Sequence, residues 1–306
     1  MPALAVVIPT YNCAPFLAES LDSILCQVDA ETEIIVVDDG SEDDTAAVLS
    51  RYAERITVVT APHRGLSAAR NLGLAHTTAD WIAFHDADDI ALPERIAFPW
   101  AYLGSHPSVD ALFCNGERLE RPNERTIPSD LTMRCATRPL TAADIFHGFP
   151  IYFQGALIPR RAFLEAGDFD PSLEVQPDID YGYRLVSRFR AMFVDRVLFR
   201  YRWRPGGNSR DRLGGREDIA RILERLLAED GAAARAIGKR RLRARLGRHY
   251  FRIARARGAR GETERGRQAA RRAVELMPLN LRYQLLYRLG AIRRSLDSVP
   301  RLRLMS

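Results

Sequence analysis

The sequence predicts an α/β fold with a mostly parallel sheet and flanking helices, followed by a basic helical extension. Over residues 4–84, short apolar runs alternate with segments whose apolar residues recur at helical spacing. This alternation is typical of parallel sheets with right-handed crossovers. Residues 231–306 hold 21 Arg and Lys against 4 acidic residues, a net charge of +17, whereas residues 1–230 hold 24 basic and 35 acidic residues, a net charge of −11. An acidic body therefore precedes a strongly basic tail.

The first third of the chain supplies four predicted strands. Residues 4–8, 33–37, 56–60 and 81–84 are short apolar runs, several of them rich in valine and isoleucine, as expected of buried strands. Helices are predicted between them, over 17–28, 45–52 and 66–75, because apolar residues recur there at helical spacing. Residues 9–12 break the first run with turn chemistry.

After about residue 115 the alternation is lost. Residues 115–138 are polar and contain proline, so we expect a long loop or a weak hairpin. Strands are predicted over 152–159 and 192–201, the second with a break near Asp195 and Arg196, and helices over 160–166 and 179–189. From residue 218 the pattern is helical, with breaks expected at Gly231, Gly258, Gly261 and Pro278.

The composition indicates a globular protein of a reducing compartment. Hydrophobic residues make up 46% of the chain, enough for a sizeable core. The cysteines form no Cys-x-x-Cys pair, so buried free thiols are expected rather than disulfides or a zinc site; they are Cys13, Cys26, Cys114 and Cys135. With no export signal and no apolar run of about 18 residues, we expect a cytoplasmic location.

Polar clusters follow three of the predicted strands, at the edge where parallel sheets bind ligands. Residues 9–12 follow the first strand and residues 85–89 follow the fourth. Asp38 and Asp39 follow the second, and a carboxylate there can accept hydrogen bonds from a base or a ribose hydroxyl. The Gly-Ser that comes next also favours a simple turn, and both interpretations can hold together.

Asp86, Asp88 and Asp89 place three carboxylates in four positions. Carboxylates this close repel one another unless a cation joins them, and hard oxygen ligands suit Mg²⁺ or Mn²⁺ bound jointly with a diphosphate. The alternative is that Asp89 caps a helix that follows it. Arg64 and Arg70 flank a predicted helix start, where they are either charge partners of a diphosphate or surface residues.

These segments together resemble glycosyltransferase family 2, the inverting enzymes of the GT-A fold. The resemblance rests on residues 7–12, 35–41, 65–71 and 86–89, which occur in the family's order and spacing, and it extends less strongly to about residue 210. It implies a GT-A domain over 1–217, with a nucleotide-sugar half (1–115) and an acceptor half (116–217). Residues 218–306 would then be a basic helical extension.

The resemblance also implies roles for residues of the nucleotide-sugar half. Pro9, Tyr11 and Asp39 would hold the nucleotide base, with Asp38 near it. Arg70 would lie close to the diphosphate. Asp86 would lie near the ribose and the metal, and Asp88 would be the direct ligand of Mn²⁺ or Mg²⁺. The donor implied is a UDP-sugar.

In the acceptor half, residues 176–185 resemble the segment that carries the family's catalytic base. Asp178 takes the place of that base, and Asp180 and Arg184 match a second acid and an arginine. The sequence departs from the family at Pro177, where a Glu is usual, but proline is well tolerated at a helix start. Alternatively, Asp178 is only a helix cap. Residues 201–209 resemble a loop over the diphosphate, with candidate phosphate contacts at Arg202, Arg204 and Ser209.

We therefore expect a metal-dependent glycosyltransferase that acts with inversion in cell-surface polysaccharide or glycolipid synthesis, on a glycan or lipid-linked acceptor. One alternative is a sugar nucleotidyltransferase, whose usual Gly-rich phosphate loop residues 9–12 do not match. Another is an inactive sugar-nucleotide-binding module, with Pro177 marking lost activity. The basic tail predicts peripheral contact with the inner face of an anionic membrane. A solvated face without a partner is its alternative, and nothing else favours nucleic acid.

Overall fold

The computed structural model describes residues 4–126, 137–203 and 211–297. The chain forms two compact units, residues 1–208 and 209–306, which we call the α/β unit and the helical unit. The domain boundary expected at 217/218 falls inside helix α8 (Arg212–Glu229), which belongs to the helical unit. Within the three ranges, no helix combines the length and apolar character that crossing a membrane requires.

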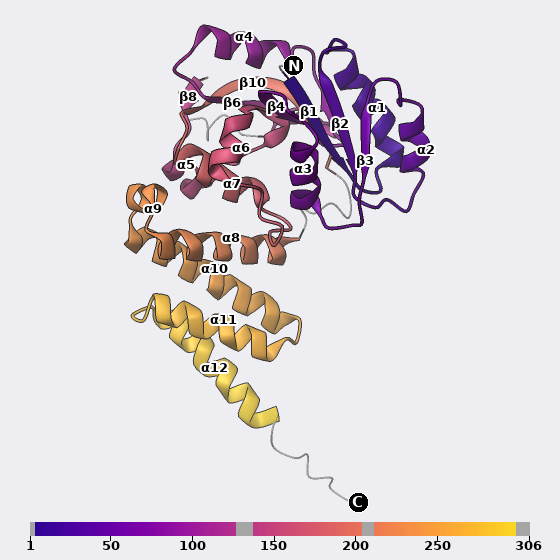
Figure 1. The fold of residues 1–306 in the computed structure, drawn as a ribbon. Helices are drawn as coiled ribbons and strands as arrows, with labels where there is room; N and C mark the ends of the chain where they lie inside the picture. Colours follow the sequence, from indigo (N-terminus) through magenta and orange to yellow (C-terminus); the bar gives the residue numbers. More distant parts are fainter. Residues whose placement is uncertain (1–3, 127–136, 204–210, 298–306) are drawn as a thin grey trace, which may run out of the picture. The chain divides into compact units, whose positions relative to one another are not determined.

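A ten-stranded sheet forms the centre of the α/β unit (Figure 1). Its order is β3-β2-β1-β4-β9-β6-β10-β5, with β7 paired to β6 and β8 to β10. The strands are β1 (Leu4–Thr10), β2 (Glu33–Asp38), β3 (Thr57–Thr60), β4 (Trp81–Phe84), β5 (Ile90–Ala91), β6 (Ala111–Arg118), β7 (Arg121–Arg125), β8 (Thr137–Pro139), β9 (Ala156–Pro159) and β10 (Ala191–Tyr201). On the main path, β3, β2, β1, β4, β6 and β10 share one direction, and β9 runs against its neighbours. The mostly parallel sheet predicted from the sequence is confirmed.

Helices cover both faces of this sheet. Leu17 and Leu21 of α1 (Ala14–Leu25) pack with Val6 and Ile8 of β1, and the same cluster includes side chains of α2 (Thr45–Ser50) and α4 (Ala97–Ser105). Val7 points to the other face, where it meets Gly73 of α3 (Leu66–Ala75). Successive side chains of β1 therefore pack against helices on opposite faces of the sheet, as expected of a strand buried on both sides.

The second helical layer also contains an aromatic cluster. It joins Phe84 of β4 to side chains of the 3-10 turn η1 (Phe153–Gly155), α6 (Arg160–Ala166) and α7 (Pro177–Val186). Its rings lie mostly edge to face, for example Phe84 and Phe153 with centroids 5.7 Å apart, an arrangement that aromatic pairs prefer. The remaining helix of the unit, α5 (Ala142–His147), begins with a capping box formed by Thr141 and Asp144.

The part of the α/β unit after residue 115 departs most from the prediction. The weak hairpin that was one alternative for residues 115–138 is present, since β7 pairs antiparallel with the end of β6. The difference is that β6 is an interior strand, in which Asn115 and Gly116 are buried, and residues 127–136 lie outside the described residues. Residues 153–155 form a 3-10 turn, so the strand expected from 152 begins at Ala156. The irregularity expected near Asp195 is confirmed, since the β6–β10 register shifts there. Cys13 and Cys114 are buried thiols as expected, but Cys26 is exposed at the end of α1.

The helical unit contains α8, α9 (Ala232–Ile237), α10 (Lys239–Ala259), α11 (Thr263–Leu276) and α12 (Leu281–Asp297). The breaks expected at Gly231, Gly261 and Pro278 occur between helices. Gly258, however, lies inside α10. An additional break occurs at Gly238, whose φ of 92° places it in a backbone region that favours glycine.

Candidate active site

The predicted polar residues gather where β1, β2 and β4 end. Pro9 and Thr10 still belong to β1, because Pro9 pairs with Val37 of β2, so the turn expected at 9–12 begins only at Tyr11. Asp38 ends β2, and Asp86 follows β4 by two residues. Since these strands are parallel neighbours, their carboxyl ends bring residues far apart in sequence to one edge of the sheet.

Asp39 organises the loop that follows β3. Its carboxylate accepts the backbone N–H groups of Arg64 at 2.9 Å and Gly65 at 2.8 Å, and the His63 ring nitrogen Nδ1 lies 2.8 Å from it. The His63 ring stacks on Tyr11, with centroids 3.9 Å apart and planes inclined by 18°. His63 was not among the residues predicted from the sequence, although its position just after the third strand was a usable signal.

Asp38 has a different role from Asp39. Its Oδ1 accepts the backbone N–H of Ser41 at 2.9 Å, which is the turn that the sequence also favoured. Both carboxylates are buried, at about 5% exposure. Asp38 thus shapes the loop between β2 and α2.

Arg70 joins the two halves of the α/β unit. Its guanidinium donates to Oδ1 of Asp178, in α7, and lies 3.4 Å from Oδ1 of Asp86, after β4. The side chain is 1% exposed, and its guanidinium carbon lies between 5.3 and 5.5 Å from the ring centroids of Phe84, Phe153 and Phe169. The interpretation of Arg70 as a surface residue is therefore wrong. Arg70 is a buried cation that holds a carboxylate from each half.

Asp86 is held on its other oxygen by Gln154 of η1, whose side-chain amide donates to Oδ2. Gln154 is itself fixed by Arg95, because Nε of Arg95 donates to the Gln154 backbone oxygen at 2.5 Å. Burial raises the pKa of Asp86 to about 6, with Arg70 opposing the rise and Asp88 and Asp178 adding to it. Neither Gln154 nor Arg95 was identified from the sequence, since they reach the site only through the fold.

Asp89 is a buried carboxyl rather than a helix cap. A short strand, β5, follows it, and its Oδ1 accepts the backbone N–H of Arg202 at 2.9 Å. Burial, reinforced by Asp86 and Asp88, raises its pKa well above the ordinary value. The cap interpretation failed because the helix expected next begins only at Ala97.

Arg202 contacts the loop that carries Asp88 and anchors it to α1. Its Nε donates to the Asp88 backbone oxygen at 2.8 Å, its Nη2 lies 2.6 Å from Glu19 of α1, and its guanidinium carbon lies 4.8 Å from the Phe16 ring centroid. These contacts differ from the phosphate contact considered for this arginine. The other two candidates, Arg204 and Ser209, lie outside the described residues.

The aspartate loop fits a divalent cation that is shared with a substrate. Asp88 is half-buried beside two carboxyls whose pKa values burial and mutual repulsion raise, and a cation would relieve that repulsion. Within the described ranges, no group of three or more His, Cys, Asp or Glu side chains could hold a metal by itself. The donor set therefore suits Mg²⁺ or Mn²⁺ that completes its coordination with phosphate oxygens.

Asp178 lies in the first turn of α7, a helix that begins at Pro177. Proline suits this position, because the first turn of a helix has no intrahelical partner for its N–H groups. The alternative that Asp178 caps the helix is not supported, since the flanking position is Gln176. Among the described residues, Arg70 is the hydrogen-bond partner of Oδ1 of Asp178, which leaves Oδ2 able to accept another.

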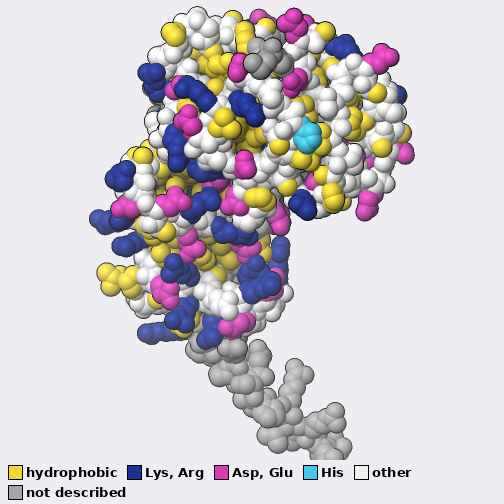
Figure 2. Space-filling model, in the orientation of Figure 1, with side chains coloured by type: hydrophobic (Ala, Val, Ile, Leu, Met, Phe, Trp, Pro, Cys, Tyr) yellow, Lys and Arg dark blue, Asp and Glu magenta, His cyan; other side chains and the backbone are white. Residues whose placement is uncertain are grey.

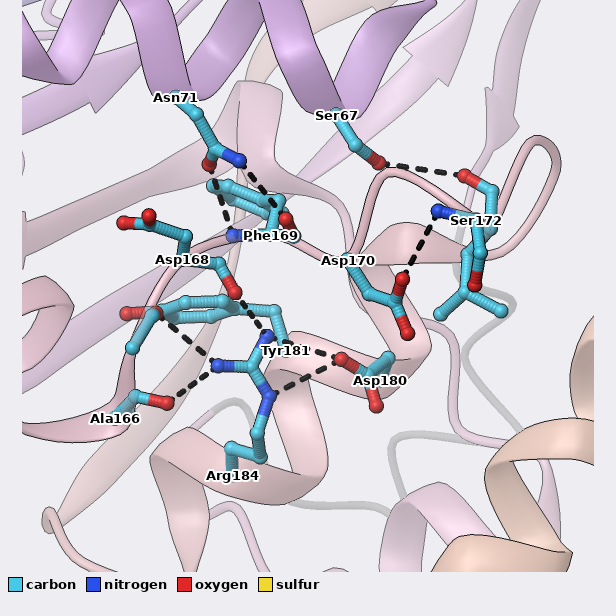
Figure 3. A network of polar contacts seen from close by, with 12 residues as sticks. Ser67, Asn71, Ala166, Asp168, Phe169, Asp170, Ser172, Asp180, Tyr181 and Arg184 are labelled. Atoms are coloured by element: carbon cyan, nitrogen blue, oxygen red, sulfur yellow. Dashed lines mark hydrogen bonds and ion pairs between the residues drawn. The ribbon is translucent and has the colours of Figure 1, made fainter.

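A network of polar contacts fixes α7 against the preceding loop (Figure 3). Arg184 reaches Asp180 at 2.9 Å and the backbone oxygen of Asp168 at 2.8 Å. From α3, the side chain of Asn71 exchanges two hydrogen bonds with the backbone of Phe169, at 2.8 and 2.9 Å. The orientation of Asp178 therefore depends on α3 twice, through Arg70 directly and through Asn71 by way of this loop.

Comparisons with known proteins point to one enzyme family. Residues 5–163 match the model of the family described as glycosyl transferase family 2. An uncharacterized glycosyltransferase of Rickettsia prowazekii is 27% identical over 208 residues, which cover 66% of this chain and 64% of that protein. The uncharacterized glycosyltransferase EpsJ of Bacillus subtilis is 27% identical over 221 residues, which cover 67% of this chain and 62% of EpsJ.

Two solved structures share the fold. Residues 1–349 of TarS from S. aureus superpose with a TM-score of 0.67 and 20% identity, over 96% of this chain and 87% of that one. The same protein has been solved with UDP-GlcNAc. The mannosyltransferase PcManGT from Pyrobaculum calidifontis, solved with GDP-Man and Mn²⁺, superposes with a TM-score of 0.61 and 21% identity, over 97% of this chain and 88% of that one.

Proposed function

The chain belongs to glycosyl transferase family 2, and we propose that it transfers a sugar from a UDP-sugar to an acceptor hydroxyl group with inversion at the anomeric carbon. The observation that carries this proposal is the bridge made by Arg70, which holds Asp86 of the nucleotide-sugar half and Asp178 of the acceptor half. Transfer between two bound molecules requires groups of both halves at a fixed separation, and a buried cation between two carboxylates provides it.

The donor would bind along the carboxyl edge of the sheet. Pro9, Tyr11 and Asp39 would contact the nucleotide base, with Asp38 supporting the loop beneath it. The stacked rings of Tyr11 and His63 offer an aromatic surface at this point. Structural neighbours bound to UDP-GlcNAc and to GDP-Man support a nucleotide-sugar donor.

The diphosphate would lie at the aspartate loop. Asp88 would bind Mn²⁺ or Mg²⁺, and Asp86 would lie on the ribose side. When bound, the cation would neutralise negative charge on the departing diphosphate. Because Arg70 is buried and paired, we assign it to positioning Asp86 and Asp178 instead of direct phosphate contact.

Asp178 would act as the general base. Its Oδ2 would accept the proton of the acceptor hydroxyl as that oxygen attacks the anomeric carbon from the face opposite the leaving group. Arg70 holds Oδ1 and so orients the carboxylate. A single displacement of this kind inverts the configuration at the anomeric carbon.

Two substitutions test these assignments. Asp178→Asn keeps the size of the side chain and removes its basicity, so transfer should fall by at least about a hundredfold, the range of general-base contributions, while UDP binding is retained. Asp88→Ala should weaken metal-dependent UDP binding measured by calorimetry. Loss of UDP binding in Asp178→Asn, or unchanged metal-dependent binding in Asp88→Ala, would contradict the roles given.

Product analysis tests the reaction class. Release of UDP from a UDP-sugar is expected of a transferase, whereas release of pyrophosphate would indicate a nucleotidyltransferase. If neither product forms although UDP binds, the chain is an inactive binding module. The anomeric configuration of the product, determined by NMR, distinguishes inversion from retention.

We place the reaction in cell-surface polysaccharide or glycolipid synthesis, with a glycan or lipid-linked acceptor, at the inner face of the cell membrane. The basic helical unit supports this placement, since residues 231–306 carry a net charge of +17. A cytoplasmic enzyme that reaches a lipid-linked acceptor needs a peripheral contact with the membrane.

A further inference from the structure

Leucines are exposed in an ordered row where α12 begins. Leu279, Leu281, Leu285 and Leu289 are between 51% and 93% exposed. The last three follow one another at intervals of four residues and therefore lie on one face of the helix. Asn280 fixes the helix start, because its side-chain oxygen accepts the backbone N–H of Arg282 at 3.1 Å. We call Leu281, Leu285 and Leu289 the leucine stripe.

The leucine stripe faces away from the contact that holds α12 in its unit. Tyr283 is 6% exposed and stacks on Phe251 of α10, with ring centroids 4.9 Å apart. Tyr283 lies two residues from both Leu281 and Leu285, which is about 200° around an α-helix. The helix thus uses one side for packing and presents leucines on the other.

Arginines flank the leucine stripe on α12. Arg282 and Arg288, both exposed, are sequence neighbours of its first and last leucine. Neither forms an ion pair with any acidic side chain that the structure describes. On α11, by contrast, Arg271 pairs with Glu275 at 3.0 Å. The charge around the stripe is therefore not neutralised by the protein itself.

The adjacent helix adds a second row of unneutralised charge. On α10, exposed arginines recur on one face without an ion-pair partner among the described residues; they are Arg241, Arg248, Arg252 and Arg255. Two of them, Arg248 and Arg252, lie close enough to Tyr283 to oppose the rise of its pKa on burial, so these two lie near the first turn of α12, where Phe251 of α10 also stacks on Tyr283. Figure 2 shows Lys and Arg side chains spread over the visible face of the helical unit.

We infer that the leucine stripe and the two arginines beside it, Arg282 and Arg288, dock the chain on an anionic lipid bilayer, with α12 lying in the plane of the interface. Leucines on one helix face insert among the acyl chains, while guanidinium groups bind lipid phosphates. A second copy of the chain is a poor occupant, because it would bring two segments of +17 together. Nucleic acid would leave the leucines in water.

The inference deepens the membrane placement made under the proposed function but does not depend on the reaction. Its test is co-sedimentation of the full chain with phosphatidylcholine vesicles, with and without phosphatidylglycerol. We expect binding only to the anionic vesicles, and binding that weakens as salt increases. The triple variant L281S/L285S/L289S should bind at least about tenfold more weakly, the effect of losing even one inserted leucine. The affinity of R282Q/R288Q for anionic vesicles should fall about fivefold for each arginine replaced.

A matched control is available at Leu164 of α6, which is 73% exposed in the α/β unit, so L164S should bind vesicles like the unsubstituted chain. Circular dichroism verifies that the variants keep their helices, and UDP release in the absence of vesicles should be equal in all of them. Failure of the reaction is thereby separated from failure of docking. Equal vesicle binding by the triple variant and the unsubstituted chain overturns the inference. So does a dimer, seen by analytical ultracentrifugation, that the triple variant loses.

Discussion

Replacing Arg70 by methionine tests whether the bridge organises the site. Methionine is also a long, unbranched side chain and can pack among Phe84, Phe153 and Phe169. It leaves Asp86 and Asp178 without the cation that both contact. The change therefore removes charge from the centre of the site while the apolar packing around it is largely kept.

The free energy of unfolding that R70M should lose follows from the burial of Arg70, Asp86 and Asp178. Removing one member of a buried ion pair costs about 3–5 kcal/mol. Asp86 and Asp178 are each about one fifth exposed, and Gln154 still holds Asp86, so we expect the lower end, about 3 kcal/mol. For a unit of this size the melting temperature should fall by roughly 6–12 °C. The pKa of Asp86, already raised to about 6, should rise further.

A double-mutant cycle in guanidinium chloride isolates the bridge. R70M and D178N should show a coupling free energy of roughly 1–3 kcal/mol, because the two side chains are in contact. R138M is the matched control, since Arg138 forms a largely buried ion pair with Asp144 of α5 instead of a contact with α7. Its cycle with D178N should be additive to within about 0.5 kcal/mol.

The kinetics of R70M add a readout that stability alone does not move. If Arg70 positions the base, kcat should fall in the folded variant while KM for the donor changes little. If R70M lowers the free energy of unfolding by less than about 1 kcal/mol, or if R70M and D178N are additive, Arg70 does not bridge the site as described. A rise in donor KM with kcat unchanged would instead assign Arg70 to donor binding.

Three further changes have defined outcomes. R202Q removes the hydrogen bond to the Asp88 backbone oxygen. Mn²⁺-dependent UDP binding, measured by calorimetry, should weaken by about 10–100-fold. Unchanged affinity would show that this hydrogen bond is not needed for metal binding. G73A would place a Cβ 2.4 Å from Val7 and should lower the free energy of unfolding by about 1–3 kcal/mol. Burial lowers the pKa of His249 from 6.5 to about 4. Below pH 6.5 the unfolded chain binds a proton that the folded chain does not, so stability should fall by up to about 3 kcal/mol between pH 6.5 and 4. H249Q should flatten this part of the stability profile, and an equally steep profile in H249Q would assign the loss to other groups.

The structure of residues 4–115 could be predicted closely because its signals are local. Strands β1, β2 and β4 are apolar runs buried on both faces, and α3 keeps its apolar residues at helical spacing. The aspartates follow these strands directly. Their meeting at one sheet edge needs only the rule that parallel strands end on the same side.

The rest of the α/β unit could not be predicted as closely, because its elements depend on distant partners. Strand β6 includes Asn115 and Gly116, which look like turn residues, yet it lies between β9 and β10 in the sheet. Gly116 is needed there because a Cβ would meet the Phe199 ring at 2.5 Å. Local propensity favours a loop, and tertiary packing overrides it.

By itself the sequence determined the fold class, the order of the first strands and helices, the family, and the basic character of the C-terminal segment. These follow from periodicity, motif spacing and composition, which are properties of neighbouring residues. Only the tertiary structure decided that Arg70 is buried and bridges Asp86 to Asp178, residues 92 positions apart in the chain. The physical reason is that a buried cation is stable only where folding brings carboxylates to it. A local pattern of residues does not identify these carboxylates, because they come from distant parts of the chain.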